Sequence, residues 1–240
     1  MNHKIIQLWS GPRNISTAFM YSFTQRNDTQ VLDEPLYAHY LVKTGIEHPG
    51  REDVLQSQEH DGNKVMEKII SGSWEKPILF CKQMTHHLID IDLNFLKTSF
   101  NLLLIRNPKQ VLISYAKVIS QPQLSDIGIK QNFDLYHYLN ENNFHCLILD
   151  SNELLKNPEK LLQIICNEAE IEFQPSMLKW EAGPKKEDGV WAKYWYENVH
   201  RSTGFEPFKE KETELPLHLG KIYSESKPYY DFLYQHSLKA

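Results

Sequence analysis

Two short segments carry side chains whose types and spacing suggest chemistry. The first is WSGPRNIST, residues 9–17, which follows an apolar run and leads into a helical pattern. A strand, a tight turn and a helix in that order bring free backbone N–H groups and the positive end of the helix to one point. Arg13 adds a permanent cation that can bind phosphate through two parallel hydrogen bonds, and Ser16 and Thr17 add hydroxyl donors. This loop is therefore predicted to bind an anion such as phosphate.

The loop differs from both familiar nucleotide-binding patterns. The triphosphate loop GxxxxGK[ST] is not matched, because Ile15 and Ser16 stand where its second glycine and its lysine would be. The dinucleotide pattern GxGxxG is not matched either, because Gly11 is alone. On this loop by itself, the competing interpretation is an ordinary turn with a surface arginine.

The second segment is LLLIRNPKQVLISYAKV, residues 102–118. Arg106 ends its apolar run, and Ser114 follows eight residues later in a helical pattern. Ligands of open α/β sheets bind outside the carboxyl ends of the strands, so Arg106 should lie at the same edge of the sheet as Arg13. The two arginines together predict a site for a ligand with two phosphates.

The elements that must position these side chains alternate along the chain. Nearly continuous apolar runs predict strands buried on both faces at 4–10, 28–35, 76–84, 100–108 and 144–151. Helical patterns lie at 14–26, 36–44, 51–72, 107–120, 131–142 and 158–170, and a last helix is expected within 228–238. This alternation predicts an α/β fold, a three-layer sandwich around a central, mostly parallel sheet of about five strands.

Composition narrows the class of protein. The 240 residues include 41% hydrophobic side chains, enough for a single domain over 1–240, with an aromatic-rich C-terminal segment, 180–240, that covers one end of the sheet. The net charge of −5 argues against a nucleic-acid partner. No run approaches the roughly 20 apolar residues of a membrane span, no signal-peptide pattern is present and the three cysteines show no CxxC spacing. We expect a cytoplasmic protein that does not bind membranes.

These motifs resemble those of the sulfotransferases, which use 3′-phosphoadenosine 5′-phosphosulfate (PAPS) and release adenosine 3′,5′-bisphosphate. SGPRNISTAF is similar to their 5′-phosphosulfate loop, and IRNPKQVLISYAKV to their 3′-phosphate motif. The resemblance implies a P-loop NTPase-like fold. More narrowly, the chain resembles the sulfotransferase-like proteins related to a domain fused to aminotransferase-like proteins, through WSGPRNISTAFMYSF, VLDEPLYAHYL, MLKWEAGPKKEDGVWAKYWY and VHRSTGF.

The resemblance also implies which residues bind PAPS. The late Arg-Lys-Gly segment that helps to hold the 3′-phosphate in many sulfotransferases is not present here. GPKKEDGVWAK stands at a comparable place, with Lys185, Lys186 and Lys193 as possible substitutes. The expected PAPS-binding residues are Arg13, Asn14, Ile15, Ser16, Thr17, Arg106, Ser114 and Lys185.

Sulfuryl transfer needs a base for the acceptor and a cation for the leaving phosphate. Arg13 is the expected cation. Glu34, directly after the second predicted strand, is the preferred base, because some bacterial and polysaccharide sulfotransferases carry a glutamate there. The neighbouring Asp33 could equally be the functional carboxylate.

A histidine is the rival base. His86 or His87 ends the third apolar run, where cytosolic sulfotransferases have a Lys-x-His pair, although Lys82 and His86 are more widely spaced here. Two adjacent histidines could suggest a metal, but neighbours in a strand point to opposite faces and no third ligand stands at a standard spacing. No metal is therefore expected.

The sequence thus predicts transfer of a sulfuryl group from PAPS to a hydroxyl or amine of a small-molecule acceptor. One alternative is a P-loop phosphotransferase or hydrolase, which would bind ATP or GTP with Mg²⁺. The other is a noncatalytic nucleotide-binding interaction module. It would bind its ligand without turnover, and Glu34→Gln would leave that binding unchanged.

Overall fold

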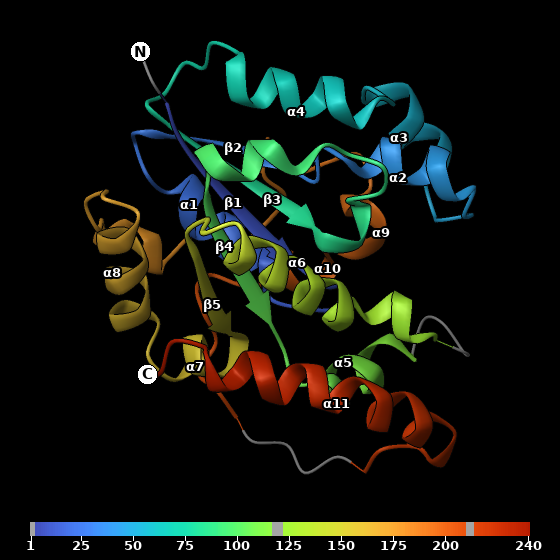
Figure 1. The fold of residues 1–240 in the computed structure, drawn as a ribbon. Helices are drawn as coiled ribbons and strands as arrows, with labels where there is room; N and C mark the ends of the chain where they lie inside the picture. The colour runs from blue at the N-terminus through green and yellow to red at the C-terminus, as the bar shows by residue number, and fades with distance from the viewer. Residues whose placement is uncertain (1–2, 117–121, 210–213) are drawn as a thin grey trace.

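A five-stranded parallel sheet forms the centre of the protein (Figure 1). The computed structural model describes residues 3–116, 122–209 and 214–240. The strand order is β2-β3-β1-β4-β5, so the first strand lies in the middle and the chain crosses over to reach each edge. The strands are β1 (Lys4–Ser10), β2 (Thr29–Asp33), β3 (Ile78–Met84), β4 (Phe100–Ile105) and β5 (Cys146–Asp150).

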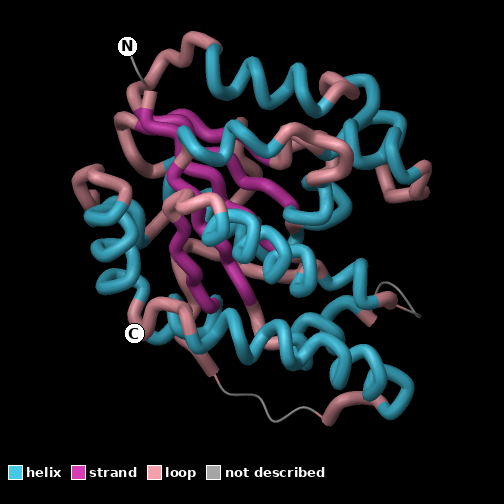
Figure 2. Tube along the Cα trace, viewed as in Figure 1, coloured by secondary structure: helices cyan, strands magenta, loops and turns pink. Residues whose placement is uncertain are grey.

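Helices cover both faces of this sheet and complete the three-layer α/β sandwich that the sequence predicts (Figure 2). They are α1 (Ser16–Thr24), α2 (Tyr37–Thr44), α3 (Arg51–Ser57), α4 (Gly62–Ser71), α5 (Pro108–Tyr115), α6 (Ile129–Glu141), α7 (Ser151–Lys156), α8 (Pro158–Glu168), α9 (Ala192–Trp195), α10 (Glu197–His200) and α11 (Gly220–Gln235). Short 3₁₀ turns lie at η1 (Thr85–His87), η2 (Leu93–Thr98), η3 (Leu124–Ile127), η4 (Pro175–Leu178) and η5 (Leu217–Leu219).

The two faces of the sheet pack against different sets of helices. On one face, Ile6 and Leu8 of β1 share a core with α1, α7 and α8. On the other face, Trp9 of β1 packs with α5, α6 and α11, and Ile5 packs with α4. Because neighbouring side chains of a strand enter opposite cores, β1 is apolar at most of its positions.

Several predicted boundaries were wrong. The predicted helix 51–72 is two helices, because Gln58 turns away to bind the backbone N–H of Ala38 and Asp61 caps α4. The predicted strand 144–151 is followed at once by α7, which the sequence analysis missed. The last helix is longer than the predicted 228–238, since packing of α11 overrides Pro228 in its interior. The end of the predicted helix 107–120 lies outside the described residues.

The C-terminal segment also departs from expectation. Its first part, up to Glu206, borders the carboxyl ends of the strands, but α11 packs on a face of the sheet beside α5 and α6 (Figure 1). No helix of the described residues combines the length and apolarity required to cross a bilayer.

The backbone of the loop between β1 and α1 lies in close contact with the backbone of the turn before α6. A Cβ atom on Gly11 would lie 2.4 Å from the carbonyl oxygen of Ile127, and one on Gly128 would lie 2.6 Å from the Cα of Gly11. Gly128 also has a φ of +73°, a backbone conformation that favours glycine. The close approach of these two backbone segments fixes the position of the loop at the end of the sheet.

We therefore expect Gly11→Ala to lower the free energy of unfolding by about 1–3 kcal/mol, because the new methyl group must push the loop off η3. Urea denaturation of the two proteins measures this difference. Gly220→Ala is the control, since a Cβ there meets nothing within 4 Å and the φ of Gly220, −58°, is helical. Equal losses in both variants would contradict this account of the loop.

Candidate active site

A cleft of about 930 Å³ opens at the carboxyl ends of the strands. The β1–α1 loop, the residues after β2, β3 and β4, and the segment Trp191–Glu206 all contribute to its walls. It therefore gathers most of the residues that the sequence singled out: Arg13, Asn14, Ile15, Ser16, Thr17, Glu34, His86, Arg106 and Ser114.

The N-terminus of α1 opens onto the cleft without a cap. No side chain of the described residues accepts a hydrogen bond from its first turn. Arg13, just before the helix, has a φ of +56°, an uncommon conformation for a residue other than glycine. The side chain of Ile15 packs against the hydrophobic core, which explains how an apolar residue is accommodated in an anion-binding loop.

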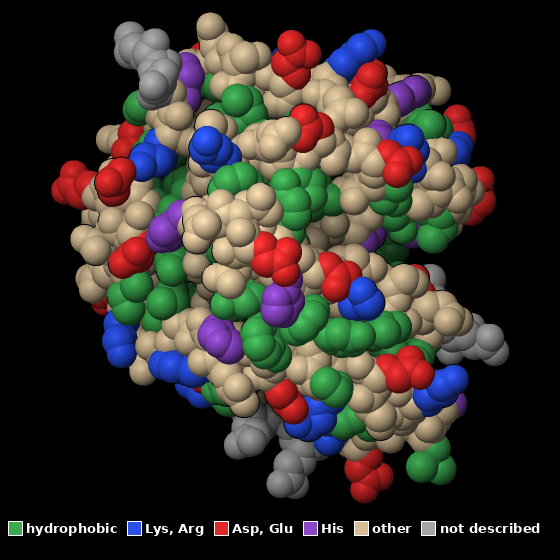
Figure 3. All heavy atoms as spheres, in the orientation of Figure 1, with side chains coloured by type: hydrophobic (Ala, Val, Ile, Leu, Met, Phe, Trp, Pro, Cys, Tyr) green, Lys and Arg blue, Asp and Glu red, His purple; other side chains and the backbone are tan. Residues whose placement is uncertain are grey.

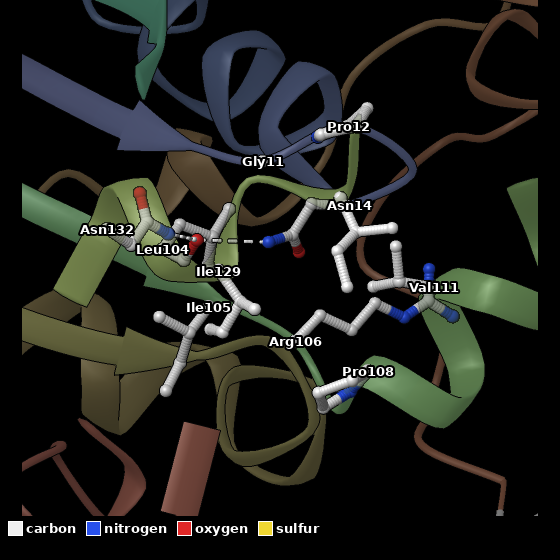
Figure 4. A pocket seen from close by; sticks show the side chains of 11 residues that line it. Gly11, Pro12, Asn14, Leu104, Ile105, Arg106, Pro108, Val111, Ile129 and Asn132 are labelled. Atoms are coloured by element: carbon white, nitrogen blue, oxygen red, sulfur yellow. Dashed lines mark hydrogen bonds between the residues drawn. The ribbon is translucent and has the colours of Figure 1, made fainter. Parts of the chain in front are cut away.

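Asn14 supports the loop from below. Its Nδ2 donates to the carbonyl oxygen of Leu104 at 3.0 Å, and its Oδ1 accepts from the N–H of Ile15 at 2.9 Å. Asn132 of α6 donates to the same Leu104 oxygen at 3.4 Å, so the two amides meet at the end of β4 (Figure 4). Both functional groups of the Asn14 side chain are thus used within the protein, over a void of only about 10 Å³.

The two arginines predicted from the sequence lie next to each other. Nη1 of Arg106 donates to the carbonyl oxygen of Arg13 at 2.6 Å, while Nε of Arg13 donates to Oγ of Ser114 at 3.1 Å. Burial, and then the neighbouring charge of Arg13, lower the pKa of Arg106 from its ordinary value. Neither guanidinium forms an ion pair with a carboxylate of the described residues. An anion in the cleft would supply the missing negative charge.

A buried ionic cluster lies at the ends of β2 and β3. The Lys82 ammonium is 2.8 Å from Oδ1 of Asp33, 2.6 Å from Oε1 of Glu34 and 2.6 Å from the hydroxyl of Tyr196. Lys82 is only 1% exposed. Full burial of an ammonium group requires this kind of compensation.

Glu34 is held at an unusual geometry within this cluster. Its φ is +40°, its N–H donates to the carbonyl oxygen of Lys82 at 2.8 Å, and its own carbonyl accepts from Gln58 at 3.0 Å. Burial raises the pKa of its carboxyl group, and the charge of Lys82 opposes that effect. Oε2 accepts no hydrogen bond from the described residues, so one oxygen remains available.

The two histidines are arranged differently from the prediction. They lie in the 3₁₀ turn η1, where their rings meet edge-on at a centroid distance of 4.6 Å, so the expectation of opposite strand faces was wrong. His87 is buried and stacks between Tyr37 and Tyr40. His86 lines the cleft, and burial lowers its pKa to about 4. Its imidazole is therefore neutral at physiological pH, and its low pKa makes it a weaker base than an ordinary histidine.

The late lysines lie away from the arginines. The ammonium of Lys185 donates to the carbonyl oxygen of Glu181, Lys186 is 90% exposed, and Lys193 forms an ion pair with Asp53 at 2.8 Å. None of the three lines the cleft. The structure therefore brings no lysine of this segment to the arginine pair.

Sequence reasoning named Asp33 and Glu34, but it missed that both residues, together with Tyr196, contact the buried Lys82. A lysine within the apolar run ILFCKQM was a usable signal, because a charge buried in a strand requires a partner. Tyr196 had no such signal, since it stands among other aromatic residues that pack in the core.

The sequence is similar to known proteins over nearly its whole length. The sequence model of the sulfotransferase domain matches residues 3–233. The branched-chain-amino-acid aminotransferase-like protein 1 of Arabidopsis thaliana is 40% identical over 234 residues, which are 97% of this chain and 42% of that protein. The chain thus spans less than half the length of this curated relative.

Solved structures show the same fold. The sulfotransferase domain of the Synechococcus PCC 7002 olefin synthase superposes with a TM-score of 0.56 at 18% identity, covering 93% of this chain and 94% of that one. Mouse sulfotransferase SULT7A1, solved in complex with PAP, superposes with a TM-score of 0.52 at 11% identity, covering 98% and 84%. The match of the domain over nearly the whole sequence places this chain in the sulfotransferase family.

Proposed function

We propose that this protein binds PAPS in the cleft and transfers its sulfuryl group to a hydroxyl or amine of a small acceptor. The observation that carries the proposal is the pair of guanidinium groups, Arg13 and Arg106, next to the uncapped N-terminus of α1. Two adjacent cations without carboxylate partners in the described part of the chain suit a ligand with two anionic groups. The family and the PAP complex of SULT7A1 support the same ligand.

The two phosphates divide between the two arginines in this proposal. The first turn of α1, with Arg13, Ser16 and Thr17, binds the 5′-phosphosulfate, and Arg106 with Ser114 binds the 3′-phosphate. Asn14 contributes indirectly, because its side chain already holds the loop to β4. Lys185 would reach the ligand only if its segment moved, since its ammonium contacts Glu181.

PAPS supplies an electrophilic sulfuryl group on a phosphate leaving group. Glu34 accepts, at the free Oε2, the proton that the acceptor loses as its oxygen or nitrogen bonds to sulfur. Arg13 and the end of α1 neutralise the charge left on the bridging oxygen when its bond to sulfur breaks. The left-handed backbones of Arg13 and Glu34 support these roles, because such strain concentrates at functional sites.

Adenosine 3′,5′-bisphosphate should raise the melting temperature of the protein by several degrees, because a ligand at 100 times its Kd adds about 2.7 kcal/mol of stability. ATP and GTP, with or without Mg²⁺, should produce smaller shifts. A thermal-shift panel of these nucleotides measures the difference. A preference for ATP would contradict the proposal.

Arg106→Ala should weaken binding of adenosine 3′,5′-bisphosphate by about 10- to 100-fold, because a charge-assisted hydrogen bond contributes about 1.5–3 kcal/mol. Affinity for 5′-AMP should fall much less, since that nucleotide lacks the 3′-phosphate and Arg106 affects its site only through the carbonyl oxygen of Arg13. Isothermal titration calorimetry measures both affinities. Lys109→Ala is the matched control, because it removes one positive charge from α5, the helix that follows Arg106, at a position outside the cleft. Equal losses for the two nucleotides would show that Arg106 does not read the 3′-phosphate.

Glu34→Gln should lower the rate of sulfuryl transfer by about 10²–10⁴-fold while leaving the affinity for adenosine 3′,5′-bisphosphate unchanged. In the wild-type protein the rate should rise with pH as Glu34 loses its proton, and burial places this rise above the usual range of a glutamate. Transfer of ³⁵S from PAPS to a panel of phenols, alcohols and amines provides the assay. If His86→Asn abolishes transfer and Glu34→Gln does not, the histidine is the base.

A further inference from the structure

The hydroxyl of Tyr196 uses all of its hydrogen-bonding capacity inside the ionic cluster. It donates to the Asp33 carboxylate, whose oxygens lie 2.9 and 2.8 Å away, and accepts from Lys82 at 2.6 Å and from Nε1 of Trp191 at 3.1 Å. A phenol has one proton to donate and accepts through its oxygen, so this set of partners satisfies it. The ring is 5% exposed and lies beneath the Lys82 ammonium, 4.9 Å from ring centroid to Nζ.

The Lys82 ammonium is satisfied in the same way. Its three protons match three acceptors, namely Asp33, Glu34 and Tyr196, which come from the end of β2 and from the segment 189–196. The N–H of Gly189 adds a bond to Oδ2 of Asp33 at 3.1 Å. The segment 189–196 therefore encloses the ammonium on the side away from β2.

We propose that Tyr196 is a positioning residue for Glu34, acting through Lys82 and Asp33. The inference rests on the proposed role of Glu34 as the base. Tyr196 and Asp33 take two protons of Lys82, so that the ammonium offers a single proton to Glu34 and occupies Oε1 alone. Oε2 then remains directed to the acceptor. Without the hydroxyl, Lys82 is free to shift between Asp33 and Glu34, and the base loses its fixed orientation.

The groups that face Glu34 come from four segments. They are Asp33 of β2, Lys82 of β3, Tyr37 of α2 and Tyr196 next to α9. Burial and Asp33 favour the protonated form of Glu34, whereas the charge of Lys82 favours its carboxylate form. Loss of the Tyr196 hydroxyl redistributes the protons of Lys82 between Asp33 and Glu34, and it must therefore move the pKa of Glu34.

The test compares wild-type protein with Tyr196→Phe, which keeps the ring and removes only the hydroxyl. Glutamate labelled with ¹³C at the carboxyl carbon reports the titration of Glu34 by NMR, and Glu34→Gln identifies its signal. We expect the midpoint of the Glu34 titration to move in Tyr196→Phe, because the Lys82 proton that the hydroxyl accepted becomes available to Asp33 and Glu34. In the transfer assay, the low-pH limb should move in the same direction and kcat should fall about tenfold, with an unchanged KM for PAPS.

Tyr194→Phe is the matched control, because Tyr194 lies two residues before Tyr196, in α9, but is 46% exposed and outside the cleft. In Tyr194→Phe, the carboxyl group of Glu34 should titrate as it does in the wild-type protein. Lys82→Gln serves as the second variant, with folding checked by circular dichroism, and it should raise the midpoint, because it removes the positive charge that favours the carboxylate of Glu34. An unchanged Glu34 midpoint in folded Tyr196→Phe would overturn the inference.

The NMR titration separates this inference from the proposed function. If the wild-type protein binds no adenosine 3′,5′-bisphosphate, the proposed function fails, while the titration still shows whether Tyr196 is coupled to Glu34. If the nucleotide binds and the midpoint does not move, only the role of Tyr196 fails.

Discussion

The burial of the Lys82 ammonium is the constraint on which the rest of the cleft depends. An isolated charge in the interior of a sheet costs several kcal/mol, and loss of one partner of a buried pair typically costs about 3–5 kcal/mol. The groups that compensate the Lys82 charge are the carboxylates at the end of β2 and the hydroxyl of Tyr196, which is 114 positions away from Lys82 in the sequence. The edge of the sheet, the turn after β2 and the segment 189–196 must therefore form together.

The two sides of the cleft therefore differ in their charge. On the side of β3, the single positive charge of Lys82 faces two carboxylates, Asp33 and Glu34, and among the described residues only Oε2 of Glu34 lacks a hydrogen-bond partner. On the side of β4, Arg13 and Arg106 have no carboxylate among the described residues. The face of the molecule in Figure 3 carries both signs of charge interspersed with apolar groups, without such a separation. The separation in the cleft suits an anionic donor that faces a neutral or protonated acceptor.

The sequence predicted the features of the fold and the cleft that depend on short segments of the chain. The five strands followed from apolar runs, and the position of Arg13 and Arg106 followed from the rule that parallel strands end at one edge. Three features could not be predicted in this way: the break at Gln58, the length of α11 and the contacts of Tyr196. Each of them depends on residues distant in the chain, which the periodicity of a local segment does not reveal. Asn14 illustrates the same limit, because its residue type suits a ligand contact as well as the bond to Leu104 that it makes.

The hydrogen bond from Arg106 to the carbonyl oxygen of Arg13 has a thermodynamic consequence. An anion that orders Arg106 also restrains the loop at Arg13, and an anion on the loop restrains Arg106 in return, because linkage between two sites is reciprocal. The two ends of a bisphosphate would then bind with positive cooperativity, even though each contacts its own arginine. A ligand fragment that occupies only one of the two phosphate sites would order the other site only in part, so the second site would still lose conformational entropy when it binds its own anion.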